Sequence, residues 1–282
     1  MLHALSFDVE EYFQVHAYTG VIDPALWDEY PSRVQLGTRI ILDLLAEAGT
    51  SATFFTLGWV GKRHPQLVRD IVAAGHELAS HGYNHRRVDT QTPDEFRRDV
   101  RAAKEILEQV AGVPVTAYRA PSFSINDRTP WAHAILVEEG YTLDSSVRRS
   151  TAPFTIQIAS GSLTEFPVPA MSVMGRQIGV GGGGYFRLFP LWVTHRAIRA
   201  AQRAGQPFCV YLHPWEFDPD QPRIMTSIVT TWRQRIGLSR TAIRLKQLLQ
   251  SFQFGTLAKS LSHSRVAVEG TTDPLGAIER VA

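Results

Sequence analysis

The feature that most constrains the fold of this chain is a repeated alternation of strand-like and helix-like segments joined by short links. Short apolar runs rich in β-branched and aromatic residues indicate strands, and apolar residues at helical spacing indicate helices. The strand-like runs are 2–7, 52–57, 77–80, 115–118, 141–143, 163–168 and 208–212. The helix-like segments are 34–48, 64–72, 92–110, 130–139, 190–204 and 240–249. This alternation predicts an α/β protein with a largely parallel sheet, either open or closed into a barrel.

The size of the chain fits a single large core. Its 282 residues are 44% hydrophobic, and although this length would permit two domains, α/β barrels reach it as one unit. We therefore expect one domain over residues 1–260, including a C-terminal helical extension. Residues 261–282 carry little apolar pattern, which predicts a flexible tail.

Charge and cysteine content exclude some classes of protein. The net charge of +2 gives no support for nucleic-acid binding, and the basic excess lies late, in residues 233–265. A solvated helix face explains that excess better than a site for an anionic partner. The single cysteine, Cys209, rules out an internal disulfide and is expected in the core. The glycine run 181–184 indicates a flexible or closely approached loop, and it lacks the lysine of a phosphate-binding loop.

No targeting or membrane-spanning segment is visible in the sequence. The N-terminus enters a strand without the basic and apolar regions of a signal peptide, and no apolar run approaches the ~20 residues that span a bilayer. The sequence therefore predicts a cytoplasmic protein with no stable membrane insertion.

Two histidines follow the strand-like run 77–80 directly. His81 and His85 are four residues apart, and on one helical turn that spacing places both imidazoles on the same face. Such a pair can bind one metal ion, whereas either histidine alone is more often a packed or surface residue.

Other polar residues also come just after predicted strands. They are Asp8, Glu10, Arg119, Asp144 and His213. In α/β barrels the catalytic groups gather at the C-terminal ends of the strands, so we expect these side chains to converge on one mouth.

A metal site needs a third ligand besides the two histidines. Asp8 and Glu10 share one strand face, because side chains alternate along a strand. Two histidines and one carboxylate are typical of a catalytic zinc site, and the other carboxylate would serve as the general base. A helix cap or a surface charge is the alternative for each acidic residue.

Arg119 and His213 suggest supporting roles. Arg119 would pair with a carboxylate, for which Asp8 is the candidate, and a plain structural ion pair is an open alternative. His213 could donate a proton to a leaving group, with Asp144 or Glu216 setting its tautomer, or it could be a core histidine. Tyr12, in an aromatic loop, and Trp215 are candidates for stacking on a sugar ring, although aromatic loops also serve as lids on a core.

The ordered motifs resemble those of a known family. They are Ser6-Phe7-Asp8, Thr53-Phe54-Phe55, His81-Gly82-Tyr83-Asn84-His85, Arg119-Ala120-Pro121-Ser122 and Leu212-His213-Pro214. Together they resemble the polysaccharide deacetylases, the NodB-homology enzymes of carbohydrate esterase family 4. The segments 7–13 and 182–187 resemble the subgroup that accompanies exosortase (PEP-CTERM) exopolysaccharide gene clusters.

This resemblance implies a distorted (β/α)7 barrel, a divalent metal ion, usually Zn²⁺, and hydrolysis of N-acetyl groups from amino sugars. It implies that Asp8 is the base, that Arg119 orients it, and that His213 is the general acid. It further implies that His81 and His85 bind the metal and that the backbone N–H of Ser122 stabilises the oxyanion. The family's usual Asp-Asp is Asp8-Val9 here, so Glu10 takes the place of the second aspartate. Asp144-Ser145-Ser146 also departs from the usual motif, which ends in Asp-Trp.

We therefore expect a metal-dependent deacetylase of a polysaccharide or of its lipid-linked precursor, in exopolysaccharide biosynthesis. Without a signal peptide, it would act at the inner face of the membrane. Two alternatives are a hydrolase of a small cyclic amide or ureide and a catalytically silent carbohydrate-binding protein.

Overall fold

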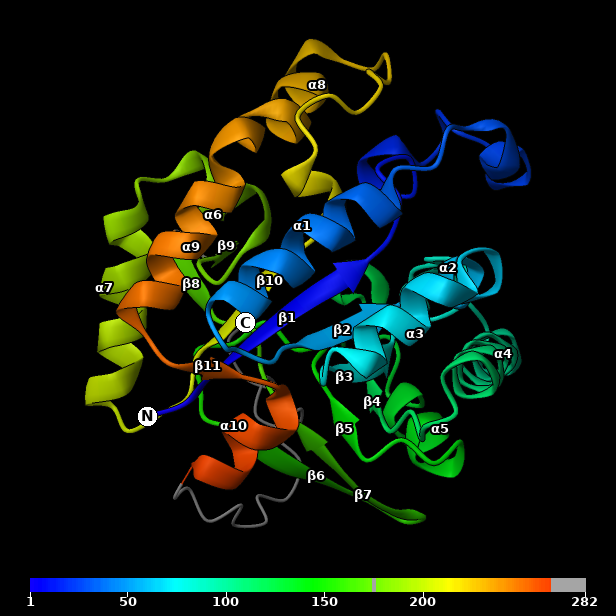
Figure 1. Ribbon diagram of the computed structural model, residues 1–282. Helices are drawn as coiled ribbons and strands as arrows, with labels where there is room; N and C mark the ends of the chain where they lie inside the picture. Colours follow the sequence, from blue (N-terminus) through cyan, green and yellow to red (C-terminus); the bar gives the residue numbers. More distant parts are fainter. Residues whose placement is uncertain (174–175, 265–282) are drawn as a thin grey trace.

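A mainly parallel sheet forms the centre of the molecule, as the computed structural model shows for residues 1–173 and 176–264 (Figure 1). Its strands are β1 (His3–Val9), β2 (Thr53–Thr56), β3 (Glu77–Ser80), β4 (Ala117–Tyr118), β5 (Leu143–Asp144), β6 (Phe154–Ile158), β7 (Gly161–Glu165), β10 (Cys209–Leu212) and β11 (Phe254–Gly255). Their order is β10-β1-β2-β3-β4-β5-β7-β6, with β11 paired to β1. All pairs are parallel except β6–β7.

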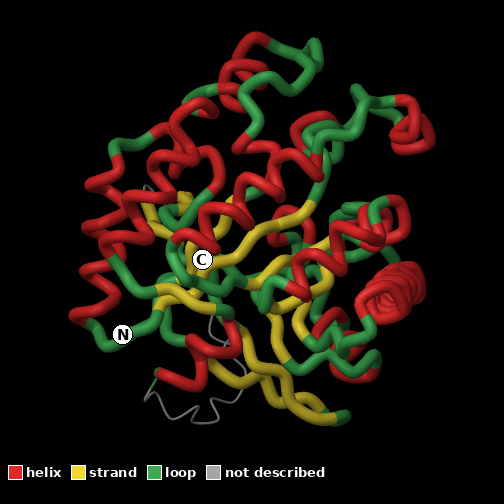
Figure 2. The backbone as a smooth tube through the Cα atoms, viewed as in Figure 1, coloured by secondary structure: helices red, strands yellow, loops and turns green. Residues whose placement is uncertain are grey.

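Helices surround this sheet, with the strands gathered at the centre of the view (Figure 2). The α-helices are α1 (Val34–Glu47), α2 (Gly58–Arg63), α3 (Pro65–Ala73), α4 (Pro93–Ala111), α5 (Ala132–Glu138), α6 (Gly183–Leu188), α7 (Leu191–Arg203), α8 (Ile228–Arg235), α9 (Thr241–Ser251) and α10 (Leu257–His263). Short 3-10 helices are η1 (His16–Tyr18), η2 (Pro24–Glu29), η3 (Val88–Thr90), η4 (Pro121–Phe123), η5 (Pro214–Phe217) and η6 (Leu238–Arg240). In this view helices α2 to α5 lie on the right, α6, α7 and α9 lie on the left, and α1 crosses the centre.

Local sequence explains why these elements form where they do. The side chains of β1, β2 and β10 are buried along their whole length, as expected of parallel strands covered on both faces. Helix α4 begins with a capping box between Thr92 and Glu95 and ends at Gly112, whose left-handed backbone stops the helix.

The predicted α/β architecture and its distorted, barrel-like sheet are confirmed. The sheet curves into a half-barrel. It stays open, because among the described residues its edge strands β10 and β6 lie at opposite ends of the strand order. Sequence patterns missed the antiparallel β6–β7 hairpin and the separate hairpin of β8 (Ala170–Val173) with β9 (Arg176–Gly179). Both lie in a stretch where helical periodicity is absent, so only the strand-like part of β7 was expected.

The end of the chain is described only in part. Helix α10 extends to His263, inside the segment predicted to be a flexible tail, and residues 265–282 of that segment lie outside the described residues. The extent of the single domain, 1–260, stays a prediction. No helix in the described ranges combines the length and the apolar character needed to cross a membrane.

The glycine run is a closely approached segment beside β10. The N–H of Tyr211 donates to the carbonyl of Gly181 at 3.0 Å. A Cβ atom on Gly182 would lie 1.7 Å from the carbonyl oxygen of Tyr211, and backbone cannot yield to that contact as a flexible side chain would. The glycines therefore let this segment lie against β10, where α6 begins.

Substituting Gly182→Ala should destabilise the protein, because the added methyl group collides with the β10 backbone. We expect a loss of about 1–3 kcal/mol in the free energy of unfolding, measured by urea denaturation. The matched control is Gly184→Ala in α6, where the nearest atom, Arg187 Nη2, is 3.9 Å from the new methyl group and alanine favours the helix. Equal stability of the two variants would contradict this account of the close approach.

Candidate active site

The C-terminal ends of the parallel strands open into one cleft of about 420 Å³. Asp8 and Glu10 reach it from the end of β1, His81 and His85 from the loop after β3, and His213 from the end of β10. The predicted convergence on one mouth is therefore present for these five residues, and it arises because parallel strands end at the same edge of the sheet.

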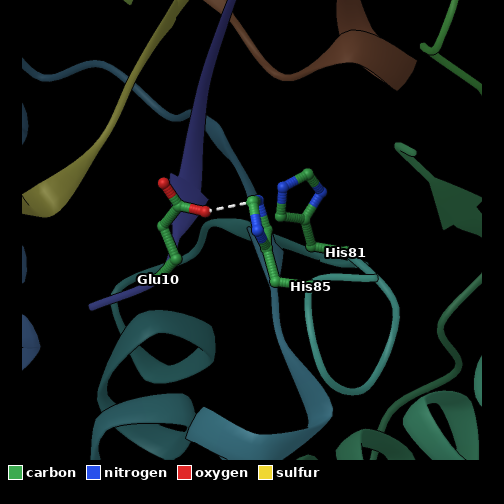
Figure 3. A group of neighbouring side chains, drawn as sticks. All are labelled: Glu10, His81 and His85. Atoms are coloured by element: carbon green, nitrogen blue, oxygen red, sulfur yellow. Dashed lines mark ion pairs between the residues drawn. The ribbon is translucent and has the colours of Figure 1, made fainter. Parts of the chain in front are cut away.

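Glu10, His81 and His85 form a cluster that can hold a metal ion (Figure 3). One ligand atom from each lies within 4.8 Å of the others, and the two imidazole centroids are 5.3 Å apart. Glu10 Oε2 is 2.7 Å from His85 Nε2, yet this buried oxygen has no hydrogen-bond partner of acceptable geometry. A donor set of two imidazoles and one carboxylate fits Zn²⁺ or a similar divalent ion.

The protein prepares His81 to act as a neutral ligand. Its Nδ1 lies 2.8 Å from the carbonyl oxygen of Arg119, which requires the proton on Nδ1 and leaves the Nε2 lone pair free. Burial lowers the pKa of His81 to about 4, so the ring is neutral near pH 7. Burial opposes the charge of Glu10, but His85, His213 and His81 outweigh it and lower the pKa of Glu10 to about 2.

The two histidines meet through loop geometry rather than through a helical turn. Residues 81–87 form no helix, and His85 adopts a left-handed backbone with φ of 52°. The loop is held by bonds from Gly58 N–H to Gly82 O, from Trp59 N–H to Tyr83 O, and from Tyr83 N–H to Asp99 Oδ2. The expected helical turn is therefore wrong, although the expected pairing of the two rings is present.

Asp8 is oriented by a buried arginine. Arg119 donates from Nη1 to Asp8 Oδ1 at 2.7 Å, and both side chains are almost completely buried. The guanidinium also donates to the Ser6 hydroxyl and to the hydroxyl and carbonyl of Ser145, and it contacts Cys209 Sγ. Burial opposes the charge of Arg119, but Asp8 outweighs it, so the pKa of Arg119 is raised. The pairing of Arg119 with Asp8 predicted from the sequence is present.

His213 has an acidic partner, and that partner is Glu216. His213 Nδ1 is 2.6 Å from Glu216 Oε1, while its Nε2 faces Asp8 Oδ2 at 3.8 Å and Glu10 Oε1 at 3.9 Å. Burial opposes the positive charge of His213, but the carboxylates outweigh it, with Glu216 contributing most, and raise its pKa to about 9. In turn, Arg187 holds Glu216 through Nε at 2.5 Å.

Asp144 does not reach His213, which corrects the expectation that it could set the tautomer. It is fully buried at the end of β5, where its Oδ1 accepts from the Ser146 hydroxyl at 2.6 Å. Its Oδ2 faces His133 Nε2 at 3.6 Å. Asp144 is the last residue of β5, and its carboxylate lies beside His133 and Glu165 instead of lining the cleft, a placement that strand periodicity does not encode.

Of the two aromatic candidates, only Trp215 lines the cleft. It donates from Nε1 to Glu10 Oε1 at 3.1 Å, and its ring stacks on His213 with centroids 5.1 Å apart. Tyr12 is only 1% exposed and packs in an aromatic core cluster with Phe13 and Trp27, so its expected contact with substrate is wrong. The aromatic loop is a lid on the core.

Ser122 lies at the cleft in a left-handed conformation with φ of 56°. Among the described residues its backbone N–H has no hydrogen-bond acceptor, so this donor is available at the mouth. Strained backbone of this kind persists where the surrounding structure enforces it.

Sequence reasoning assigned no role to Arg187, which completes the chain from Glu216 to His213. Its only signal was its place in the glycine-rich segment 182–187. Its guanidinium also donates to the backbone carbonyls of Gln234 and Ile236, which fastens the C-terminal extension to the site.

Two protein families match parts of this chain. Residues 26–142 match the family described as polysaccharide deacetylase, and residues 138–262 match a domain of unknown function (DUF3473). A peptidoglycan-N-acetylglucosamine deacetylase of Bacillus cereus is 32% identical over 90 residues, which are 32% of this chain and 42% of that protein. A chitooligosaccharide deacetylase of Rhizobium leguminosarum bv. trifolii is 34% identical over 96 residues, 33% of this chain and 45% of that protein. The chain thus spans less than half the length of these curated relatives.

Solved structures share the fold. One from Mycobacterium smegmatis, provisionally described as a polysaccharide deacetylase, has a TM-score of 0.70 at 24% identity and covers 99% of this chain and 93% of that chain. A carbohydrate esterase family 4 pseudoenzyme of Bacillus anthracis has a TM-score of 0.52 at 16% identity, over 92% of this chain and 65% of that chain. The resemblance seen in the motifs is confirmed: residues 26–142 match the polysaccharide deacetylase family, and the fold is shared with solved structures that resemble this chain.

Proposed function

We propose that this protein is a metal-dependent hydrolase that removes N-acetyl groups from the amino sugars of a polysaccharide or of its lipid-linked precursor. One observation carries the proposal: the cluster of possible metal ligands Glu10, His81 and His85 shares the cleft with an oriented carboxylate, Asp8, and with His213, which is paired with Glu216. Asp8, Glu10 and His213 lie outside residues 26–142, so their roles rest on this geometry.

Each group at the cleft has a defined task in amide hydrolysis. When bound, a divalent ion, for which Zn²⁺ is our candidate, supplies Lewis-acid polarisation and lowers the pKa of water. Asp8, oriented by its hydrogen bond from Arg119, accepts a proton from the attacking water. The Ser122 N–H donates to the developing oxyanion, and His213 gives its proton to the departing amine.

The finer parts of the proposal concern the setting of the reaction. We place it in exopolysaccharide biosynthesis, in the cytoplasm at the inner face of the membrane, where a lipid-linked precursor is accessible. The similarity of the sequence to deacetylases of peptidoglycan and chitooligosaccharides supports an N-acetylated amino sugar as substrate. The pseudoenzyme among the structural relatives makes catalytic silence the alternative to test.

Purified protein should contain one divalent metal ion per chain at this site. The double substitution His81→Ala, His85→Ala should remove it, because Glu10 alone offers one ligand. Metal content by inductively coupled plasma mass spectrometry checks this, with His76→Ala as the control, since His76 lies outside the cleft. Retention of the ion in the double variant would contradict the assignment of these ligands.

Asp8→Asn should abolish most turnover while the metal stays bound. Loss of a general base lowers the rate about 10²–10⁴-fold, and asparagine keeps the shape of the side chain. The measurement is acetate release from acetylated chito-oligosaccharides together with metal content. An unchanged rate in metal-loaded Asp8→Asn would overturn the base assignment, and wild-type protein that is metal-loaded and inert on acetylated glycans would favour the silent alternative.

Activity should be lost as pH rises through the pKa of His213, because a general acid must carry its proton. Its pKa is raised to about 9 in the folded protein, chiefly through Glu216 acting against burial. Glu216→Gln removes that carboxylate, so the alkaline limb of the kcat/KM profile should move toward the ordinary histidine value of about 6.5. A limb that stays in place would exclude His213 as the acid.

A further inference from the structure

Among the charged side chains that line the cleft, arginines outnumber carboxylates. The acidic ones are Asp8 and Glu10, and the arginines are Arg87, Arg148, Arg187 and Arg233. Both acids have tasks at the reaction centre, one paired with Arg119 and the other among the metal ligands. Positive charge therefore dominates the parts of the cleft away from that centre.

Two of the four arginines are already neutralised by carboxylates. Arg87 makes a bidentate pair with Asp89, at 2.9 and 2.6 Å, and Arg187 is held by Glu216. These guanidinium groups have structural partners and fixed positions, so they are not free to bind a further anion.

Arg148 is different, because it has no carboxylate partner among the described residues. It is exposed on the segment after β5, and its guanidinium carbon lies 4.6 Å from the ring centroid of Phe123. Phe123 follows Ser122, so stacking on this ring holds the cation beside the expected oxyanion donor.

Arg233 is the second arginine without a carboxylate partner in the described part of the chain. It is exposed on α8 and lines both the main cleft and an adjoining hollow of about 120 Å³, where Tyr211 is also shared. Residues 221–268 contain no aspartate or glutamate, so nothing acidic in the surrounding sequence competes for this cation.

We propose that Arg148 and Arg233 bind an anionic group of the substrate, a carboxylate or a phosphate, next to the sugar that is deacetylated. The inference rests on the proposed function and adds a substrate class to it, namely an acidic glycan or a phosphate-bearing sugar. A guanidinium matches the planar carboxylate and the phosphate with paired N–H donors, and a cleft lined by positive charge concentrates such ligands.

Three carbohydrate probes, two oligosaccharides and one sugar phosphate, distinguish the sources of the anion. They are a neutral N-acetylated chito-oligosaccharide, an oligosaccharide of the same length that alternates N-acetylglucosamine with glucuronic acid, and N-acetylglucosamine 1-phosphate. Acetate release is measured for wild type, Arg148→Gln, Arg233→Gln and the double variant. The control is Arg203→Gln, an exposed arginine at the end of α7, which should leave all kinetic constants unchanged.

Wild type should prefer an anionic probe, and each cleft substitution should raise its KM about tenfold relative to the KM of the neutral probe, while 0.5 M NaCl weakens the preference. The anionic probe that responds identifies carboxylate or phosphate. An unchanged ratio of KM values in the double variant overturns the proposal. If wild type releases no acetate from any probe, the proposed function fails, and calorimetric binding of the two anionic probes to wild type and the double variant still decides whether these arginines bind an anion.

Discussion

The buried ion pair between Arg119 and Asp8 is the interaction on which the arrangement of the cleft depends. The guanidinium donates to Asp8, Ser6 and Ser145, and so it ties β1 to the turn after β5. The backbone carbonyl of the same residue fixes the proton on His81 Nδ1. One residue thus orients the expected base with its side chain and an expected metal ligand with its backbone.

Such a buried pair is costly to form and more costly to break. Removing one partner of a buried ion pair destabilises a protein by about 3–5 kcal/mol, because the other charge is left without compensation. The cost of burying Arg119 is offset by its hydrogen bonds to Asp8, Ser6 and Ser145 and by the ring of Phe55, whose centroid lies 4.1 Å from the guanidinium carbon. A second buried arginine, Arg187, supports Glu216 and through it His213. An arginine therefore sets the orientation of both acid–base groups. Arg119 orients Asp8 directly, and Arg187 orients His213 through Glu216.

The fold and the side chains of the cleft carry different information about this protein. The fold is shared with a pseudoenzyme as well as with a peptidoglycan deacetylase of Bacillus subtilis, so the fold alone does not determine activity. The proposed chemistry depends on having the ligand cluster, the oriented Asp8 and the Glu216-paired His213 together in one cleft. The excess of arginines in the cleft bears on a different property, namely the kind of glycan that would bind beside these groups.

The sequence alone determined the α/β class, the main strands, and the groups that meet at the cleft, because alternation places strand ends at one edge of a parallel sheet. Only the tertiary structure decided which group touches which. A left-handed His85, rather than a helical turn, brings the histidines together, and Glu216, rather than Asp144, contacts His213. The late basic residues read as a solvated face, yet folding places Arg233 at the cleft. Turn geometry and contacts between distant segments set these outcomes, and local periodicity carries no information about either.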